Sequence, residues 1–318
     1  MARLAGIWVI VLVLYTTLIG FFPTARSPEN HVDLARRLGF YGILTLGVGT
    51  LIITGGIDLS IGSLVGLVAV AFGMLLERQV NPWLAAVAVL AAAPLVGLIH
   101  GLLVTRLGLQ PFLVTLCGLF VYRGVAKWLT KTTVGLAVSA PEEYREGVLR
   151  LVDVLVKGRT LGFPNILLWM LLLAAGLGLV LHFSVYGRYL YATGANEQAA
   201  RYAGIPTDRY KILAYVICSS CAGLGGVMFL PLYNSANPAS AGELRELYAI
   251  TGAVLGGCVL RGGEGTVPGM LLGAAVLPLL NKLCNFSDYI GSDLEYAVIG
   301  AALLLGTIVN ELIGRRRK

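Results

Sequence analysis

Long apolar stretches that contain no charged residue alternate with short polar segments along this chain. A transmembrane helix needs about 20 apolar residues, with a range of about 17–25, and most of these stretches approach that length. Because lipid cannot satisfy exposed backbone N–H and C=O groups, each stretch is expected to be helical. The pattern predicts an all-α, polytopic integral membrane protein with about ten transmembrane helices. The apolar stretches cover residues 4–22, 38–57, 59–76, 83–105, 107–122, 160–187, 212–242, 247–260, 265–281 and 296–310.

Each half of the chain contains one pair of apolar stretches with a glycine-rich interruption. The first interruption surrounds Asp58, and the second covers residues 261–264. Paired interruptions of this kind are the best pointer in a sequence to a transport site built from broken helices. Whether these pairs span fully or are re-entrant stays open. The candidates for a translocation pathway or for helix breaks are Gly56, Asp58, Ser60, Gly62, Gly263 and Glu264.

Asp58 is the only acidic residue within residues 38–76. A bare carboxylate in hydrocarbon costs several kcal/mol, so its side chain must be capped, paired or hydrated. The favoured interpretation is that Asp58 or Ser60 caps the helix that follows. A position along a polar path is compatible with that role.

Composition agrees with the membrane assignment. Of the 318 residues 57% are hydrophobic and only 13% are charged, whereas soluble domains carry about 25% charged residues. Both a water-soluble fold and a disordered chain are therefore excluded. The longest polar segment, about residues 123–159, is too short to form a core of its own. Residues 1–318 are expected to form a single transmembrane domain.

The net charge of +7 does not indicate nucleic-acid binding, because the basic residues form no long stripe. The one dense basic run, residues 315–318, is typical of a cytoplasmic anchor on anionic membrane lipid. It predicts a cytoplasmic C-terminus. With about ten crossings, residues 188–211 are then also cytoplasmic and residues 123–159 lie outside.

The cytoplasmic segment contains the signals of a short helix over residues 196–204. Asn196 is a favourable N-cap, and Glu197 suits the positive end of the helix dipole. Gly204 is expected at the C-terminal cap, and Pro206 prevents continuation. Thr207 is expected to cap the next helix. A small rigid helix of about two turns is well suited to transmit force from a soluble partner, although an ordinary connecting loop is the alternative.

Signatures of covalent chemistry are missing. The sequence contains no phosphate-binding GxxxxGK[ST] loop, no HExxH and no GxSxG, so an intramembrane enzyme is not favoured and no metal or cofactor is expected. Cys218 and Cys221 have CxxC spacing, but their apolar surroundings favour buried free thiols. His100 and His182 lie near predicted span ends, which favours an interfacial role.

Three segments resemble the permease subunits of bacterial ATP-binding cassette (ABC) importers of the ribose/xylose/arabinose type. They are Thr54-Gly-Gly-Ile-Asp-Leu-Ser-Ile-Gly-Ser63, residues 194–205 and residues 256–269. Their order and spacing agree with that family over roughly residues 35–310. One departure is Tyr248, which stands where the family usually carries an acid and follows Arg245 closely.

The resemblance implies a permease without an ATP site of its own, and therefore not an enzyme, in the bacterial cytoplasmic membrane. It implies transport of a small sugar and three kinds of partner: a second permease subunit, ATP-binding subunits and an extracytoplasmic sugar-binding protein. The alternative is a secondary transporter driven by an ion gradient, for which Asp58 is nearly the only candidate coupling residue. The residues that the resemblance assigns to coupling with the ATP-binding subunit are Asn196, Glu197, Arg201 and Gly204.

Overall fold

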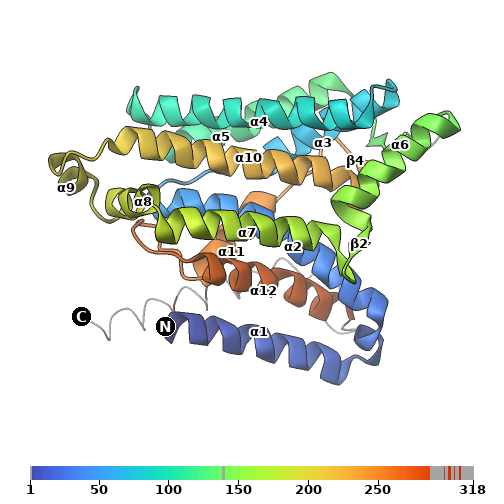
Figure 1. Cartoon of the computed structure of the whole chain (residues 1–318), viewed down its shortest axis with the longest axis horizontal. Helices are drawn as coiled ribbons and strands as arrows, with labels where there is room; N and C mark the ends of the chain where they lie inside the picture. Colours follow the sequence, from blue (N-terminus) through green and yellow to red (C-terminus); the bar gives the residue numbers. More distant parts are fainter. Residues whose placement is uncertain are drawn as a thin grey trace.

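The computed structural model describes residues 2–137 and 140–286, together with residues 297, 300, 301, 304 and 308. In this part of the chain the fold is an elongated bundle of α-helices, with strand structure limited to two pairs of two-residue strands (Figure 1). The helices are α1 (Ala2–Phe21), α2 (Pro28–Ile53), α3 (Ile61–Glu77), α4 (Pro82–Thr105), α5 (Pro111–Leu129), α6 (Glu142–Val152), α7 (Asn165–Phe183), α8 (Val185–Ala195), α9 (Glu197–Tyr202), α10 (Thr207–Tyr233), α11 (Arg245–Leu255) and α12 (Val267–Phe286). Shorter elements are the 3-10 helix η1 (Pro23–Arg26), the π-helix η2 (Asp153–Lys157) and the strands β1 (Val134–Gly135), β2 (Arg159–Thr160), β3 (Phe163–Pro164) and β4 (Ser235–Ala236).

Seven helices among the described residues are long and apolar enough to cross a membrane. The predicted all-α, polytopic class is therefore confirmed, while the number of ten crossings stays a prediction. The shorter α3 is also apolar, and the predicted stretch 296–310 lies outside the described residues except for five single positions. The seven helices are α1, α2, α4, α5, α7, α10 and α12.

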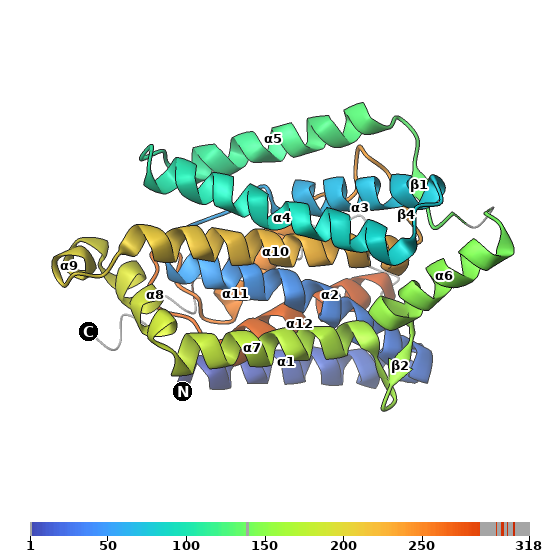
Figure 2. The same ribbon diagram turned by 45° about the horizontal axis from the view of Figure 1, so that its top comes forward.

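Helices α2 and α10 occupy the centre of the bundle and run in opposite directions (Figure 2). Of the most apolar window of each helix, 83% is buried in α2 and 67% in α10, against 11% in α1. Helix α1 packs along α12 at the periphery. The core clusters around α2 and α10, and the outer faces of α1, α4, α5 and α7 carry exposed large apolar side chains that suit contact with lipid.

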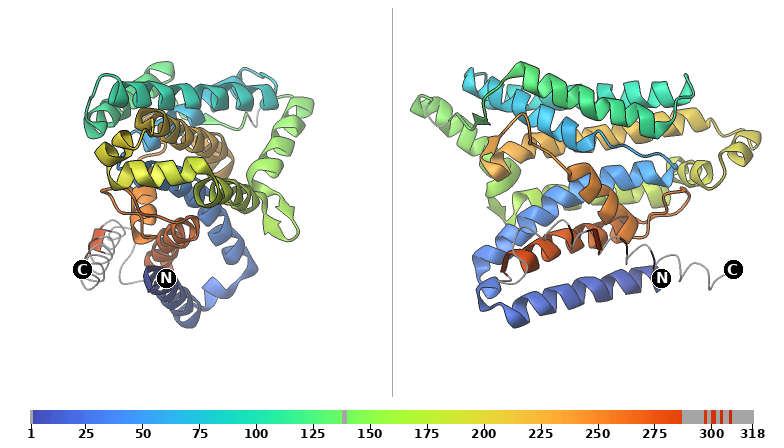
Figure 3. Two further views of the ribbon diagram at one scale, coloured as in Figure 1. Left: turned by 60° about the vertical axis from the view of Figure 1, so that its left-hand side comes forward. Right: turned by 180° about the vertical axis from the view of Figure 1, so that it is seen from behind.

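Two spans are interrupted inside the bundle. After α2 ends, residues 54–60 run back into the bundle without helical structure, and α3 covers only the remaining distance (Figure 2). After α10 ends, residues 234–244 enter from the opposite end, and α11 continues from there (Figure 3). The sequence pattern predicted one apolar span over residues 212–242, which is wrong in its last part because α10 ends at Tyr233.

The bundle has two distinct ends. Helix α9 lies at one end and α6 at the other, so residues 188–211 and 123–159 mark opposite ends, as the sequence pattern predicts (Figure 1). Residues 256–266, which contain the second predicted interruption, connect α11 to α12 at the α9 end (Figure 3). Residues 315–318, the basis for a cytoplasmic C-terminus, lie outside the described residues.

Candidate functional site

The two interrupted spans touch each other at the first turns of α3 and α11. A Cβ atom on Gly62 would overlap the Gly242 carbonyl oxygen and the Glu246 carboxylate. One turn further along α3, a Cβ atom on Gly66 would overlap the Ala241 carbonyl. These α3 positions accept only glycine, because the backbone before α11 occupies the space of a side chain.

Asp58 and Ser60 order the chain immediately before α3. Asp58 Oδ1 accepts hydrogen bonds from the Ser60 backbone N–H at 2.8 Å and from the Ser60 hydroxyl at 2.6 Å. Both side chains are fully buried. Ser60 occupies the N-cap position of α3, but its hydroxyl is committed to Asp58 and makes no capping bond. The predicted capping of α3 by Asp58 or Ser60 is therefore wrong: Asp58 stabilises the approach to the helix rather than its first free N–H groups.

His100 joins this buried group, and the sequence pattern did not predict it. Its Nδ1 lies 3.6 Å from Asp58 Oδ2, and its Nε2 lies 2.8 Å from the Tyr122 hydroxyl. The edge of the His100 ring meets Tyr215, whose hydroxyl donates to the Ile57 carbonyl at 3.4 Å. The predicted interfacial role is wrong, because His100 is only 2% exposed. No local motif signals this contact, because the whole of α3 lies between Asp58 and His100 in the sequence.

A second polar cluster lies at the start of α11. The Arg245 guanidinium is 5.3 Å from the centre of the Tyr41 ring and 5.5 Å from those of Tyr233 and Tyr248, and it donates to the Tyr41 hydroxyl. A guanidinium over aromatic faces gains cation–π attraction. Arg245 and Tyr248, which stand out from the family pattern, therefore belong to one cluster. From α5, Arg123 donates to the Ala241 carbonyl at 2.6 Å.

Gly263 and Glu264 lie apart from this centre, in the connection between α11 and α12. The Gly263 N–H donates to the carbonyl of Ile53 at 2.8 Å, and a Cβ atom on Gly194 would overlap both groups. The ends of α2 and α8 thus meet the α11–α12 connection. Glu264 is exposed, and its carbonyl accepts from the Val259 N–H at 3.3 Å.

Gly56 lies between these two regions, near the start of the non-helical segment 54–60. Its N–H donates to the Thr54 hydroxyl at 3.3 Å, and a Cβ atom would press on Leu51. A cavity of about 30 Å³ adjoins it and is lined by Lys211 and Tyr215 among others. The predicted pathway residues therefore form one buried group around Asp58 and one junction at the α9 end.

Helix α9 begins and ends as the capping signals predict. The Asn196 side chain accepts the Ala199 N–H at 3.0 Å. At the other end Gly204 has φ +80°, its N–H donates to the Arg201 carbonyl, and the Ile205 N–H donates to the Ala200 carbonyl. This pair of bonds is a Schellman motif. The helix has six residues, fewer than predicted.

The predicted cap of the following helix is wrong. Pro206 occupies the N-cap position of α10, and Thr207 is its first helical residue. The Thr207 hydroxyl is buried and has no hydrogen-bond partner among the described residues.

An ionic network fixes α9 to the start of α10. Glu197 accepts from Arg201 at 3.0 Å and from Lys211, and Arg201 also donates to Asp208 at 2.5 Å. Partial burial acts to raise the pKa of the Glu197 carboxyl, but the hydrogen bonds and charges of Lys211 and Arg201 outweigh it and lower that pKa below its ordinary value. Glu197 is therefore ionised at neutral pH.

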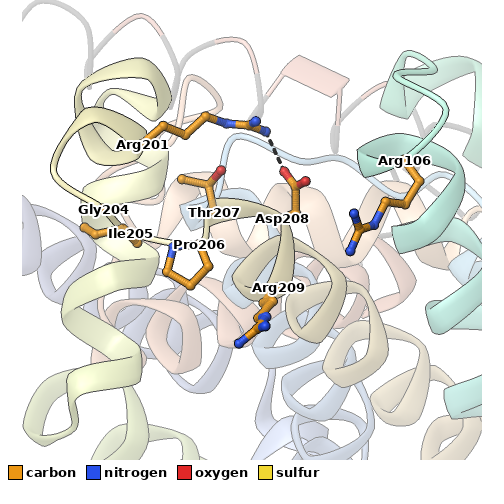
Figure 4. Close-up of a pocket in the computed structure, with 8 residues that line it drawn as sticks. All are labelled: Arg106, Arg201, Gly204, Ile205, Pro206, Thr207, Asp208 and Arg209. Atoms are coloured by element: carbon orange, nitrogen blue, oxygen red, sulfur yellow. Dashed lines mark hydrogen bonds and ion pairs between the residues drawn. The ribbon is translucent and has the colours of Figure 1, made fainter.

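Beside this network lies an open cavity of about 370 Å³. Three arginines border it, and only Arg201 among them pairs with Asp208 in the close-up view (Figure 4). The cavity therefore presents a basic surface at the α9 end. Its lining consists of Arg106, Arg201, Gly204, Ile205, Pro206, Thr207, Asp208 and Arg209.

A metal site would need several His, Cys, Asp or Glu side chains close together. The described part of the chain contains no cluster of three or more of them. Cys218 and Cys221 are buried free thiols, as their apolar surroundings predicted.

A bundle of apolar helices, with two interrupted spans that meet inside it, defines a multi-pass membrane transport protein. The family model described as "Branched-chain amino acid transport system / permease component" matches residues 30–307. The chain belongs to this permease family, and it is a transport subunit rather than an enzyme. The family predicted from three sequence segments is thereby confirmed.

Named relatives refine this assignment. The chain is 31% identical to the ribose import permease protein RbsC of Escherichia coli K12, over 94% of this chain and 91% of the relative. It is 30% identical to RbsC of Bacillus subtilis 168, over 94% of this chain and 89% of the relative. The fructose import permease protein FruF of Bifidobacterium longum is 30% identical over 76% of this chain and 66% of the relative. No solved structure matches the chain significantly.

Proposed function

We propose that this chain is the permease subunit of an ATP-driven importer and carries a small monosaccharide across the bacterial cytoplasmic membrane. The observation that carries the proposal is the similarity to ribose import permeases over 94% of the chain. The comparisons give no support to a secondary transporter. ATP binding and hydrolysis take place on a separate subunit, because the sequence contains no phosphate-binding loop.

The proposed contact with the ATP-binding subunit is the α9 end. Helix α9 is clamped at both termini and braced on α10, and its last residue, Tyr202, is 92% exposed. A short rigid helix passes on displacement better than a flexible loop does. The basic cavity beside it supports docking of an acidic segment of that partner. Asn196, Glu197, Arg201 and Gly204 form the coupling region of this proposal.

The proposed pathway passes the meeting of the two interrupted spans. Gly62 allows the close contact of α3 with the chain before α11, and Asp58 and Ser60 hold α3 in place. The complex requires a second permease subunit and an extracytoplasmic sugar-binding protein. The C-terminus lies in the cytoplasm in this proposal.

Uptake into vesicles tests the proposed function. The chain is reconstituted with its ATP-binding subunit, and the binding protein and radiolabelled ribose or fructose are added outside. Labelled leucine is the comparison substrate, because the description of the matching family names branched-chain amino acid transport. Sugar uptake that requires internal ATP supports the proposal. Uptake that persists without nucleotide, or that follows an imposed ion gradient, overturns it, and uptake of leucine alone overturns the sugar assignment.

A further inference from the structure

The buried group around Asp58 contains two polar atoms that face each other. Asp58 Oδ2 and His100 Nδ1 are both inaccessible to water, and neither has a hydrogen-bond partner within the described residues. They lie 3.6 Å apart, slightly beyond hydrogen-bond distance. A buried carboxylate oxygen that no donor reaches is unfavourable, so a proton between the two atoms is needed to offset that cost.

The position of that proton follows from the acceptors present. A carboxylate oxygen has only lone pairs to offer, and an unprotonated Nδ1 would place a second lone pair against it. The two hydrogen bonds that Oδ1 accepts from Ser60 are those of a carboxylate acceptor, and with that acceptor the proton lies on Nδ1. On the opposite side of the ring, Nε2 lies 2.8 Å from the Tyr122 hydroxyl. If Nε2 is the acceptor, the Tyr122 proton and the Nε2 lone pair are satisfied together.

We infer that His100 is a positioning residue for Asp58: it holds the Nδ1–H tautomer directed at the carboxylate, and Tyr122 stabilises this tautomer by donating to Nε2. A hydrogen bond to one ring nitrogen commonly fixes the tautomer and the orientation of a histidine. The inference concerns the protonation state and contacts of His100, and it stands independently of the transported substrate.

The arrangement connects four elements at the first interruption. Asp58 holds the chain before α3, His100 belongs to α4 and Tyr122 to α5. From α10, the Tyr215 ring packs on His100, and the Cys218 thiol lies within electrostatic range of Asp58. A displacement of α4 or α5 therefore acts directly on the carboxylate that orders the start of α3. Its consequence for transport rests on the proposed function.

Nitrogen-15 NMR of the histidine-labelled protein in lipid nanodiscs tests the tautomer directly. The chain has three histidines, and the His100 signals are identified by their loss in His100→Asn. At neutral pH we expect a protonated Nδ1 and an unprotonated Nε2 for His100, and in Tyr122→Phe the same tautomer with a shifted Nε2 signal, because the hydrogen bond to Nε2 is lost. His182→Asn is the control and should leave the His100 signals unchanged. An Nε2-protonated tautomer in the unmodified protein overturns the inference.

A comparison of two substitutions separates positioning from packing. The amide nitrogen of asparagine takes the place of His100 Nδ1, so His100→Asn keeps a donor for Asp58, whereas His100→Leu keeps only bulk. We expect a higher thermal unfolding midpoint for His100→Asn than for His100→Leu, and we expect this difference to vanish in an Asp58→Asn background. Equal midpoints of the two variants in the unmodified background overturn the inference. If one variant does not fold, the NMR comparison of the unmodified protein with Tyr122→Phe decides alone.

ATP-driven ribose uptake then shows whether positioning affects transport. We expect His100→Asn to retain more uptake than His100→Leu at equal amounts of folded protein. Absence of uptake in the unmodified complex contradicts the proposed function, while the NMR result still decides the assignment of His100. Equal uptake by both variants, with the expected tautomer present, overturns the link to transport.

Discussion

Gly62 lies where the two interrupted spans touch, and its lack of a side chain decides how closely they approach. Any Cβ atom at this position overlaps backbone and carboxylate oxygens of the chain around the start of α11. Gly178 in α7 is the natural comparison, because a Cβ atom there meets nothing within 4 Å. The two glycines share helical structure and differ in their surroundings.

We therefore expect Gly62→Ala to destabilise the protein by about 1–3 kcal/mol, the usual cost of forcing extra atoms into a packed site. Gly178→Ala is expected to be neutral or to stabilise by up to about 1 kcal/mol, because alanine is the better helix former. Unfolding by denaturant in detergent micelles measures both. Equal behaviour of the two variants would contradict the tight contact at Gly62.

Single residues differ in how well the sequence predicts them. The capping role of Asn196 could be predicted, because it depends on residues within one turn of helix. The contact of His100 with Asp58 could not, because a separate helix carries each partner and no spacing rule connects them. In the sequence Arg245 and Tyr248 stand out only as departures from the family pattern, and only the fold places them in one cluster with Tyr41.

At the scale of the element, α9 depends on a glycine in left-handed conformation. Gly204 has φ +80°, and a Cβ atom there meets nothing within 4 Å, so Gly204→Ala changes only the backbone preference. We expect a local cost of about 1–2 kcal/mol and weaker stimulation of ATP hydrolysis by the loaded binding protein. Gly162→Ala is the matched control, because Gly162 has φ +83° and equal space at the α6 end. Loss of stimulation in the control as well would contradict a specific role of α9.

The ionic network of α9 gives it a defined pH response. The folded-state pKa of Glu197 lies below its ordinary value of 4.5. Its stabilising contribution is therefore complete above that value and is lost as the pH falls through the folded-state pKa. We expect the mobility of a spin label at Tyr202→Cys to stay constant between neutral pH and pH 4.5 and to rise below it. With Glu197→Gln added, the mobility should be high already at neutral pH, and a pH response that persists would contradict the assignment.

The interrupted spans show where sequence patterns stop being informative about elements. Residues 54–60 contain an acid among glycines, so the first interruption was visible in the sequence. Residues 234–242 carry no charge, so the hydropathy pattern extended α10 across them. In the structure α10 ends at Tyr233 and is capped by Asn234 with φ +64°, and α11 begins after Leu244 with φ +60°. Non-glycine residues adopt this region uncommonly, asparagine most readily, and hydropathy does not report backbone conformation.

At the scale of the whole molecule, the features on which the proposed function rests are distributed along the bundle axis. The α9 end gathers the short clamped helix, the basic cavity and the α11–α12 connection. The opposite end carries α6, whose first turn holds Glu142 and Glu143. The bundle centre carries the meeting of the two interrupted spans. An importer needs its energy-coupling surface and its substrate entrance on opposite sides of the membrane, and the two ends of this axis suit the surfaces proposed for these roles.

The sidedness of this axis can be measured with single cysteines. Among the described cysteines only Cys117 is exposed, so a Cys117→Ser background leaves the buried thiols unreactive in the folded protein. Tyr202→Cys places a thiol on α9, and Glu142→Cys places one on the α6 end, where the native side chain is 82% exposed. In intact cells we expect a membrane-impermeant maleimide to label Glu142→Cys and to leave Tyr202→Cys unlabelled until the cells are opened. The reverse pattern would put α9 outside the cell, where no ATP-binding subunit reaches it, and the proposed coupling through this helix would then be untenable.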